Sequence, residues 1–340
     1  MNIYGLTFAQ LEQYLLQIGE KISKAPIIFT NLYRKQISSL LDISEIRQSL
    51  KEQLMQDFSL ALPRLIQQTN GTDTIKFLFA LQDENLIEAV LMRQRYGNTL
   101  CISSQVGCNM ACAFCQSGRF KRVRNLLPHE MTAQIMVIQR QLQIKISNIV
   151  LMGIGEPFDN YENVMKFLEI IQHPHGLALG PRHITVSTCG LVPQIIQYAT
   201  HPNHGMLAIS LHAPDDETRS RIMPINRRYP VAQVLEAARD CIQYTNRKVM
   251  LEYVMLQGQN DSPWQAQLLA DLLKDDDFHV NLIPYNTTQN LGFQQSEQTR
   301  IATFYNILKQ NHIVVTMRRE FGSSVNAACG QLRADYEMQQ

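Results

Sequence analysis

Three cysteines lie within eight positions of one another in the segment GCNMACAFCQSGRFKRVR, residues 107–124. Their spacing, CxxxCxxC, is tight enough for a single loop to wrap a compact inorganic cluster with thiolate ligands. Three thiolates on a four-iron, four-sulfur cluster leave one iron open for a chelating ligand. A structural zinc site is the alternative, but zinc needs a fourth ligand, and neither a second CxxC nor an HxxxH follows. The pattern favours Cys108, Cys112 and Cys115 as ligands of an iron–sulfur cluster.

A basic stretch without any acid follows the cysteines. Residues 101–150 hold six lysines and arginines against one acidic residue, whereas the formal net charge of the whole chain is only +1. A focused patch of this kind can hold a polyanion without making the protein basic overall, and a solvated loop is the ordinary alternative. The candidate anion-binding residues are Arg119, Lys121, Arg122 and Arg124.

Composition restricts the class of protein. The chain of 340 residues is 45% hydrophobic and 18% charged, which suffices for a full core in one barrel-sized domain or in two smaller ones. No apolar run approaches the roughly 18 residues of a membrane helix, and no secretory leader is recognisable at the start. Seven cysteines, an odd number with three crowded together, argue against a secreted disulfide framework. We expect a soluble protein of the reducing cytoplasm that does not engage a membrane.

The elements that must position these residues alternate regularly from about residue 96 onward. Short apolar runs rich in β-branched residues occur at 99–105, 148–153, 183–188, 206–211, 249–256 and 280–285. Helix-length segments lie between them at 129–145, 161–172, 191–200, 231–245 and 263–274. Strand followed by helix, repeated six times, predicts a parallel sheet with helical crossovers. The expected fold is therefore α/β, a partial (β/α)6 barrel.

The rest of the chain divides into three parts. Residues 1–70 have apolar positions at helical spacing and predict a small N-terminal helical module. Residues 71–95 contain two β-rich segments and predict a hairpin that links this module to the barrel at 96–290. A final helix and the apolar run at 313–317 are expected within a C-terminal extension, residues 291–340.

The unusual residues all follow an expected strand. The cysteine cluster comes after the first strand, GIGEP (153–157) after the second, STCG (187–190) after the third, SLHAP (210–214) after the fourth and PYN (284–286) after the sixth. The carboxyl ends of the strands of a (β/α) barrel meet at a single mouth, where active sites form. Motifs that are far apart in the chain are therefore expected to line one pocket.

Two of these motifs resemble those of a known superfamily. CxxxCxxC after the first barrel strand resembles the signature of radical S-adenosylmethionine (radical SAM) enzymes, and GIGEP resembles their glycine-rich SAM-binding turn. From about residue 75 to residue 335 the chain is similar to one branch, the RlmN/Cfr family of RNA adenine methyltransferases. The segments that carry this resemblance are CISSQVGCNMACAFC, MGIGEP, ISLHAPDDETRSRIMPINRRYP, LEYVMLQGQND, VNLIPYN and AACGQL.

The resemblance implies a four-iron, four-sulfur (4Fe-4S) cluster and S-adenosyl-L-methionine as cofactors, and a radical SAM barrel as the fold. In the superfamily the amino and carboxylate groups of SAM chelate the open iron, and an electron from the cluster cleaves SAM to methionine and a 5′-deoxyadenosyl radical. The Glu156 carboxylate is expected to accept hydrogen bonds from the SAM ammonium, and Gly155 to let the backbone approach the ligand. The SAM contacts implied by the family pattern are Gly155, Glu156, Ser187, Ser210, Leu211, His212 and Asn286.

The family also implies roles for two further cysteines. An sp² carbon of adenine is a poor nucleophile toward a sulfonium methyl group, whereas a thiolate attacks it readily. Cys329 of AACGQL is expected to take the methyl group from a first SAM, and a second SAM to activate it for transfer to the ring. Cys101 of CISSQ is then expected to release the product by forming a Cys101–Cys329 disulfide that a reductant reopens. Glu88 matches the family's proposed general base.

RNA is the implied partner. The target is expected to be an unstacked adenosine of 23S rRNA at the peptidyl transferase centre, with a tRNA anticodon-loop adenosine as a second candidate. The four basic residues after the cluster and the N-terminal module are expected to hold the RNA. Flavodoxin or ferredoxin is the expected electron donor, and a monomer is the expected oligomeric state.

Two questions stay open at the level of sequence. RlmN-like members methylate carbon 2 of adenine and Cfr-like members carbon 8, and this chain combines features of both: EFG before AACGQL is Cfr-like, whereas ISLHAP and LEYVML are RlmN-like. The broader alternatives are a radical SAM enzyme that acts on another substrate, which would not need Cys101 and Cys329, and a zinc-containing RNA-binding protein without catalysis.

Overall fold

A computed structural model describes residues 1–287 and 291–318 of the chain. In these residues an open sheet of ten strands forms the centre of the molecule. Within these residues, seven strands run parallel and neighbour one another in chain order: β4 (Gly97–Ile102), β7 (Asn148–Leu151), β8 (Ile184–Thr188), β9 (Met206–Ser210), β10 (Val249–Met255), β11 (Phe278–Pro284) and β12 (Val314–Met317). A separate two-stranded sheet pairs β5 (Gln105–Val106) with β6 (Arg124–Asn125). Parallel strands in unbroken chain order form a partial (β/α) barrel, so the expected fold class is confirmed.

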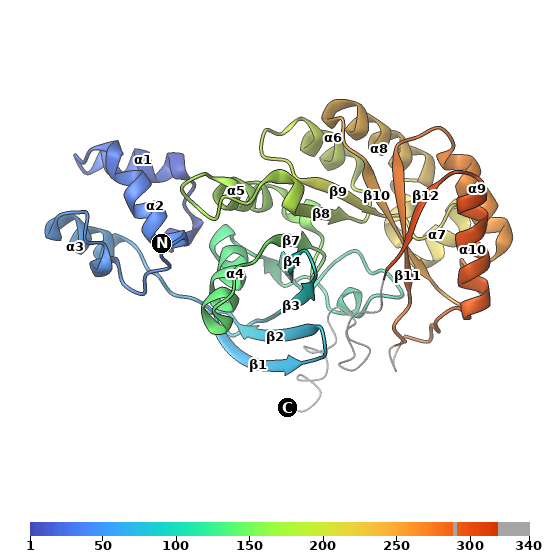
Figure 1. The fold of residues 1–340 in the computed structure, drawn as a ribbon, viewed down its shortest axis with the longest axis horizontal. Helices are drawn as coiled ribbons and strands as arrows, with labels where there is room; N and C mark the ends of the chain where they lie inside the picture. Colours follow the sequence, from blue (N-terminus) through green and yellow to red (C-terminus); the bar gives the residue numbers. More distant parts are fainter. Residues whose placement is uncertain (288–290, 319–340) are drawn as a thin grey trace.

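Helices connect the parallel strands and cover the outer face of the sheet (Figure 1). The connecting helices are α4 (Pro128–Leu142), α5 (Tyr161–Gln172), α6 (Val192–Thr200), α7 (Asp216–Ile222), α8 (Val231–Thr245), α9 (Pro263–Leu273) and α10 (Gln298–Gln310). All but α7 agree within a few residues with segments that the sequence predicts, because their apolar positions recur at helical spacing. None of the helices in the described part of the chain is both long and apolar enough to span a bilayer.

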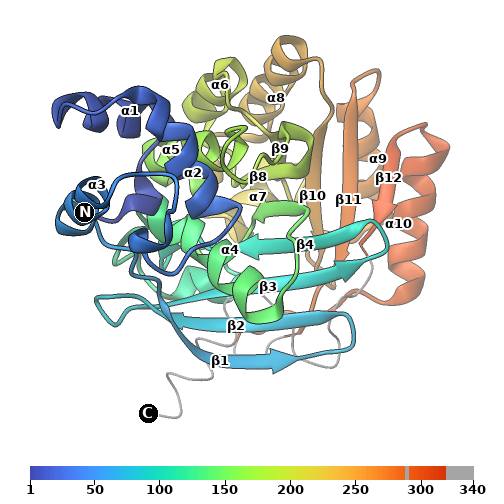
Figure 2. The ribbon, with the colours of Figure 1, turned by 60° about the vertical axis from the view of Figure 1, so that its left-hand side comes forward.

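The N-terminal edge of the sheet differs from the division that the sequence predicts. Strands β1 (Arg64–Asn70), β2 (Thr74–Ala80) and β3 (Leu86–Gln94) form an antiparallel meander, and β3 pairs with β4 (Figure 2). The predicted hairpin therefore continues the barrel sheet and is not a separate linker. β1 lies in the range for which the periodicity predicts helices, because its sequence, RLIQQTN, is largely polar and half-exposed and lacks a clear apolar alternation.

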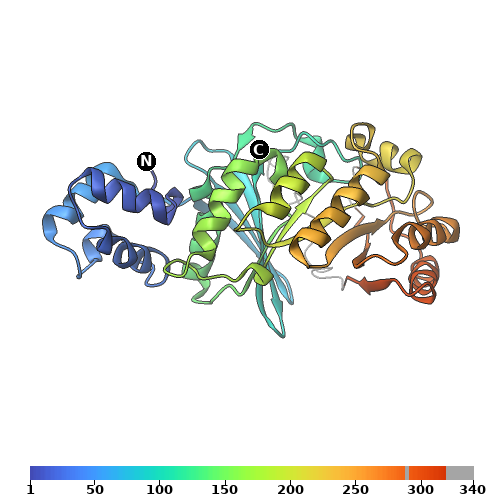
Figure 3. The same cartoon turned by 90° about the horizontal axis from the view of Figure 1, so that it is seen from above.

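Three helices at one end of the molecule form the N-terminal module (Figure 3). α1 (Phe8–Gln17), α2 (Ala25–Tyr33) and α3 (Gln48–Asp57) share an apolar core that also includes Met136 of α4 and Ile170 of α5. Arg140 of α4 donates hydrogen bonds to Tyr4 Oη at 2.9 Å and to Ile37 O at 2.8 Å. The module ends before β1 and is held firmly against two of the helices that cover the barrel.

Candidate functional site

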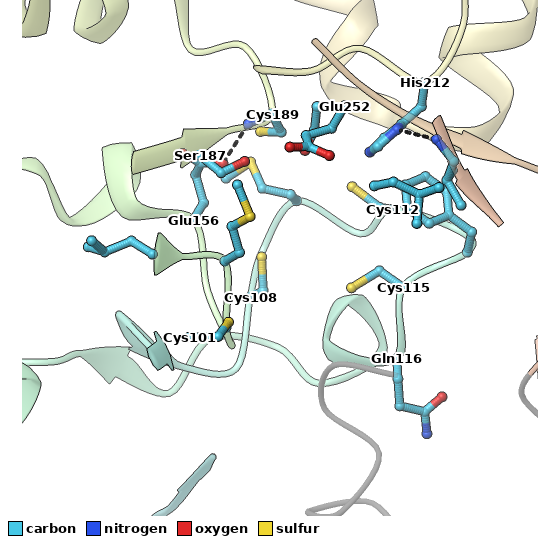
Figure 4. Close-up of a pocket in the computed structure, with 18 of the residues that line it drawn as sticks. Cys101, Cys108, Cys112, Cys115, Gln116, Glu156, Ser187, Cys189, His212 and Glu252 are labelled. Atoms are coloured by element: carbon cyan, nitrogen blue, oxygen red, sulfur yellow. Dashed lines mark hydrogen bonds between the residues drawn. The ribbon is translucent and has the colours of Figure 1, made fainter. Parts of the chain in front are cut away.

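A cavity of about 340 Å³ opens at the carboxyl ends of the parallel strands (Figure 4). Its lining comes from strands that neighbour one another in the sheet and from the three-cysteine loop. The residues predicted from the sequence that line this one cavity are Cys101, Cys108, Cys112, Cys115, Gly155, Glu156, Ser187, Ser210, His212 and Asn286. The fold brings these distant motifs together because parallel strands end at the same edge of their sheet.

The three-cysteine loop, residues 107–120, is held in place by backbone hydrogen bonds. Strands β5 and β6 pair at its base, and Cys108 N donates to Phe120 O at 2.9 Å. On the far side of the loop, Ala113 N donates to Ile222 O at 2.8 Å and ties the loop to the end of α7. A Cβ atom added at Gly118 would lie 2.9 Å from Cys112 O, so the loop closes on itself too tightly for a side chain at this position. The thiols are therefore presented by a loop that is already folded.

The thiols of Cys108, Cys112 and Cys115 face the cavity (Figure 4). Burial raises the pKa of Cys108 to about 12 and that of Cys112 well above its usual range, so thiolates at these positions need a cationic partner. Within residues 1–287 and 291–318, no three His, Cys, Asp or Glu side chains are arranged to chelate one metal ion. The ligands of a four-iron cluster need not converge on one ion, because each thiolate binds a different iron. Three thiols around one cavity fit such a cluster, and iron bound to them would deprotonate them.

The turn after β7 holds Glu156 by backbone contacts. Glu156 N donates to Gln105 Oε1 at 2.9 Å, and the Glu156 carboxylate accepts hydrogen bonds from Phe158 N at 3.0 Å and Cys189 N at 2.8 Å. Burial raises the pKa of Glu156, and these two backbone donors act in the opposite direction. Gly155 has φ +110°, and an added Cβ atom would lie 2.6 Å from Gln105 Cβ. Packing within the turn itself thus requires glycine, and the carboxylate keeps lone pairs for an ammonium donor.

The Ser-Leu-His motif after β9 divides its residues between the cavity and the core. Ser210 lines the cavity together with Ser187 of β8. Leu211 is fully buried in the apolar core of the barrel and does not line the cavity. Its side chain supports the motif by packing, and its backbone donates to Glu252 O at 3.1 Å and accepts from Arg219 Nε at 2.9 Å.

His212 is a neutral residue of the cavity wall. Its backbone is left-handed, with φ +59°, and its Nδ1 accepts a hydrogen bond from Val254 N at 3.0 Å (Figure 4). Because Nδ1 is an acceptor, the ring carries its proton on Nε2. Burial, together with the charge of Arg219, lowers the pKa of His212 to about 3. His212 is therefore uncharged at neutral pH and can offer one N–H donor.

Cys101 of β4 also lines the cavity, and Glu88 lies on the same face of the sheet. Cys101 pairs with Val90 of β3, and Glu88 is two residues before Val90, so the three side chains share a face. Glu88 is 4% exposed and does not itself line the cavity. Burial raises the pKa of Cys101 to about 11, and the charge of Arg318 acts in the opposite direction. Cys329, the other predicted catalytic cysteine, lies outside the described residues.

Comparisons with known proteins agree with this geometry. A family model described as the radical SAM superfamily matches residues 102–268. Two curated proteins named probable dual-specificity RNA methyltransferase RlmN, from Acholeplasma laidlawii and Enterococcus faecalis, are 45% and 47% identical over 98% of this chain, and the matches cover 99% and 96% of their own lengths. The crystal structure of a radical SAM methyltransferase from Sphaerobacter thermophilus is 39% identical with a TM-score of 0.92 and covers 97% of this chain and 98% of that one. The chain belongs to the RlmN family.

Membership of the RlmN family makes this chain a SAM-dependent methyltransferase of the radical SAM superfamily, with SAM and a 4Fe-4S cluster as cofactors. The three loop cysteines would hold the cluster. Glu156, Ser187 and Ser210 would hold SAM, since they line the same cavity from the neighbouring strands.

Sequence reasoning missed two charged residues of the cavity. Glu252 of β10 is 4% exposed, lines the cavity and accepts a hydrogen bond from Asn281 Nδ2 at 2.8 Å. Burial raises the pKa of Glu252. A charged residue inside the apolar run LEYVML is a signal that was available in the sequence. Arg318 also lines the cavity, but it arrives there only because β12 pairs with β11, and no local pattern marks it.

Two residues of the predicted RNA-binding patch form salt bridges within the protein. Arg124 forms a bidentate pair with Glu130, with both N–O distances at 2.8 Å, and a salt bridge with Asp83 at 2.6 Å. Arg122 forms a salt bridge with Asp159. These carboxylates lie on other elements and neutralise both guanidinium groups. Arg122 and Arg124 therefore hold the base of the three-cysteine loop in place.

The other two basic residues are solvent-exposed. Arg119 lies on the three-cysteine loop and Lys121 directly follows it. RNA binding by the four basic residues stays a prediction.

Replacing any loop cysteine should remove the cluster. Cys108→Ala, Cys112→Ala and Cys115→Ala are each expected to fall well below about four irons per chain after anaerobic reconstitution, because each thiolate holds one iron. Iron and sulfide analysis with visible absorbance measures this loss. Cys241→Ala is the matched control, since Cys241 is buried on α8 in the apolar core away from the cavity. Stoichiometric zinc without iron in the unaltered protein would contradict the cluster assignment.

Arg124 and Lys121 should differ in their effect on stability. Arg124→Gln is expected to lower the free energy of unfolding by about 1–3 kcal/mol, because Glu130 is left buried without its bidentate partner. Lys121→Gln removes an exposed charge and should change the free energy of unfolding by less than about 0.5 kcal/mol. Denaturant unfolding measures both. Equal effects would show that the Arg124 pairs contribute nothing to the fold.

Proposed function

We propose that this enzyme methylates carbon 2 of an adenosine in RNA, with 23S rRNA at the peptidyl transferase centre and a tRNA anticodon loop as substrates. The relatives named dual-specificity RNA methyltransferase RlmN are 45% and 47% identical to this chain, which supports the carbon-2 branch over the Cfr-like one. The observation that carries the proposal is that Cys101 lines the same cavity as the three loop cysteines and Glu156. A thiol beside the SAM site suits methyl transfer through sulfur, and a radical SAM enzyme with another task would not need it.

The protein contributes two thiols and a base to this reaction. Bound to the residues of the cavity, the cluster and two SAM molecules per turnover supply the methyl group and the hydrogen abstraction that activates it. Cys329 carries the methyl group on its sulfur until the carbon has joined carbon 2 of the adenine. Glu88 is the base that takes the ring proton. The Cys101 thiolate then attacks Cys329 Sγ and forms a disulfide. The bond between sulfur and the transferred carbon breaks, and the carbon keeps the electron pair and takes up a proton to become the methyl group. A reductant returns the Cys101–Cys329 disulfide to two thiols.

The surroundings of Cys101 are suited to a controlled attack. Burial raises the pKa of Cys101 to about 11, so the thiol is almost entirely protonated at neutral pH. Arg318 opposes this rise with its charge and lines the same cavity. The raised pKa keeps the resting thiol protonated, and the positive charge of Arg318 favours its ionisation.

RNA reaches the cavity over the three-cysteine loop. The exposed side chains of Arg119 and Lys121 contact the RNA backbone, and the N-terminal module adds a second contact surface. The target adenosine enters unstacked, because the base edges of duplex RNA are not accessible to a cavity of this kind. The enzyme acts as a monomer in the cytoplasm, where flavodoxin or ferredoxin supplies electrons and the resting thiols stay reduced.

The methylated nucleoside identifies the reaction. Expression of this chain in a host without its own family member should add 2-methyladenosine to 23S rRNA and tRNA, measured by mass spectrometry of digested RNA with retention times that separate the 8-methyl isomer. Cys329→Ala should abolish the product, because no thiol then accepts the methyl group. Cys241→Ala should retain it. Finding 8-methyladenosine would overturn the carbon-2 assignment, and product from Cys329→Ala would overturn the route through sulfur.

Replacing the second thiol should trap the enzyme on its substrate. Cys101→Ala is expected to accumulate a covalent enzyme–RNA adduct, because nothing remains to attack Cys329 Sγ. A denaturing gel with nuclease digestion as a check detects the adduct. The double variant Cys101→Ala/Cys329→Ala is the control and should form none. Rapid turnover of Cys101→Ala without an adduct would exclude the resolving role.

A further inference from the structure

Arg219 of α7 is a completely buried arginine beside the cavity, with 0% of its surface exposed. Its guanidinium donates five hydrogen bonds, to Leu211 O at 2.9 Å, Asn226 Oδ1 at 2.9 Å, Tyr229 O at 3.3 Å, Cys189 O at 2.7 Å and Ser210 O at 3.2 Å. Cys189 directly follows β8, and Ser210 is the last residue of β9. Both residues line the cavity. Arg219 therefore clamps two neighbouring strands where they border the proposed SAM site.

Among the described residues, Arg219 donates to five acceptors, and none of them is a carboxylate oxygen. Asp216, the acid one turn earlier on α7, uses Oδ1 to accept hydrogen bonds from Asn226 Nδ2 at 3.0 Å and Val231 N at 2.8 Å. A guanidinium stays protonated in proteins, and a buried ion without an opposite charge costs several kcal/mol. Neutral carbonyls solvate the charge. The carboxylate whose charge acts on it, Asp216, is solvent-exposed and linked to Arg219 only through the Asn226 amide. A protein that keeps such a group needs an anion close to it.

Arg219 lies on the side of the cavity that holds the loop cysteines. The helix that carries Arg219, α7, ends at Ile222, whose carbonyl accepts a hydrogen bond at 2.8 Å from Ala113 N, next to Cys112. Burial lowers the pKa of His212 in the wall of the same cavity, and the Arg219 charge lowers it further. A 4Fe-4S cluster with three thiolates has a net charge of about −1, which becomes about −2 on reduction. Such a cluster would supply the buried negative charge that compensates the Arg219 guanidinium.

We propose that Arg219 is the internal counter-charge of the iron–sulfur centre, that its positive charge raises the reduction potential of the cluster, and that its hydrogen bonds position the β8 and β9 ends of the SAM site. The charge has this effect because a cation stabilises the more negative, reduced cluster more strongly than the oxidised one. Arg219 is a positioning residue and does not touch the reacting atoms. The inference rests on the cluster at the three loop cysteines.

The midpoint potential of the reconstituted cluster tests the charge. Redox titration followed by electron paramagnetic resonance should place Arg219→Met at a more negative potential than the unaltered protein. Arg219→Lys keeps the charge but loses the fork of donors, so its potential should stay close to the original while its melting temperature falls. This split separates the electrostatic role from the hydrogen-bonding role.

A second variant removes the charge but keeps a hydrogen-bond donor. Arg219→Gln retains an amide that can donate to the carbonyls of Cys189 or Ser210, so its potential should also be more negative than that of the unaltered protein. Arg219→Gln decides the question if Arg219→Met does not fold. Arg239→Met is the matched control, because Arg239 is a partly buried arginine of α8 that bonds Asp276 and Leu272 O, away from the cavity. Its potential should be unchanged.

The outcomes separate this inference from the proposed function. Unchanged potentials in Arg219→Met and Arg219→Gln, at full iron content, would overturn the counter-charge role and leave the function intact. If the unaltered protein binds no iron and sulfide, the cluster assignment itself fails. A more negative potential in both variants, with Arg239→Met unaffected, supports the inference.

Discussion

Parallel pairing of each strand with the next one in the chain makes β4 and β7 to β12 end at the same edge of one sheet. The candidate site residues that line the cavity lie at that edge. The cysteine loop, the GIGEP turn and the ends of β8, β9 and β11 reach it from separate parts of the chain and line a single cavity. Hydrogen bonds across the edge then fix the separate pieces together, as when the Glu156 carboxylate accepts the N–H of Cys189.

The low polarity of the cavity wall controls the charge of the groups within it. Burial raises the pKa of Cys101, Cys108, Cys112 and Glu252 and lowers that of His212, so each of these groups is pushed toward its neutral form. Iron bound to the loop cysteines would reverse this, and the thiolates would then bring negative charge into a region that contains the fully buried guanidinium of Arg219. A cluster at this position would complete the electrostatics of the site.

The parts of the structure away from the cavity hold its mouth in shape. Arg124 joins the β2–β3 turn to the beginning of α4 through Asp83 and Glu130, and the base of the three-cysteine loop lies between them. The N-terminal module packs on α4 and α5. Helix α4 thus supports the base of the loop through Glu130 and carries the N-terminal module on its other side.

The local sequence determined the order and nearly the bounds of the parallel strands and their helices, because apolar periodicity is set by residues a few positions apart. It also marked Cys108, Cys112 and Cys115 as candidate cluster ligands, since their spacing within one loop already suits a cluster, and all three line one cavity. Only the tertiary structure decided that β1 joins the sheet, that Leu211 faces the core, and that Arg122 and Arg124 are neutralised by carboxylates on other elements. It alone revealed Arg219 as a buried cation next to the cavity. These features depend on which distant segments come into contact. Hydrogen bonds and burial between such segments produce no periodic pattern in the local sequence.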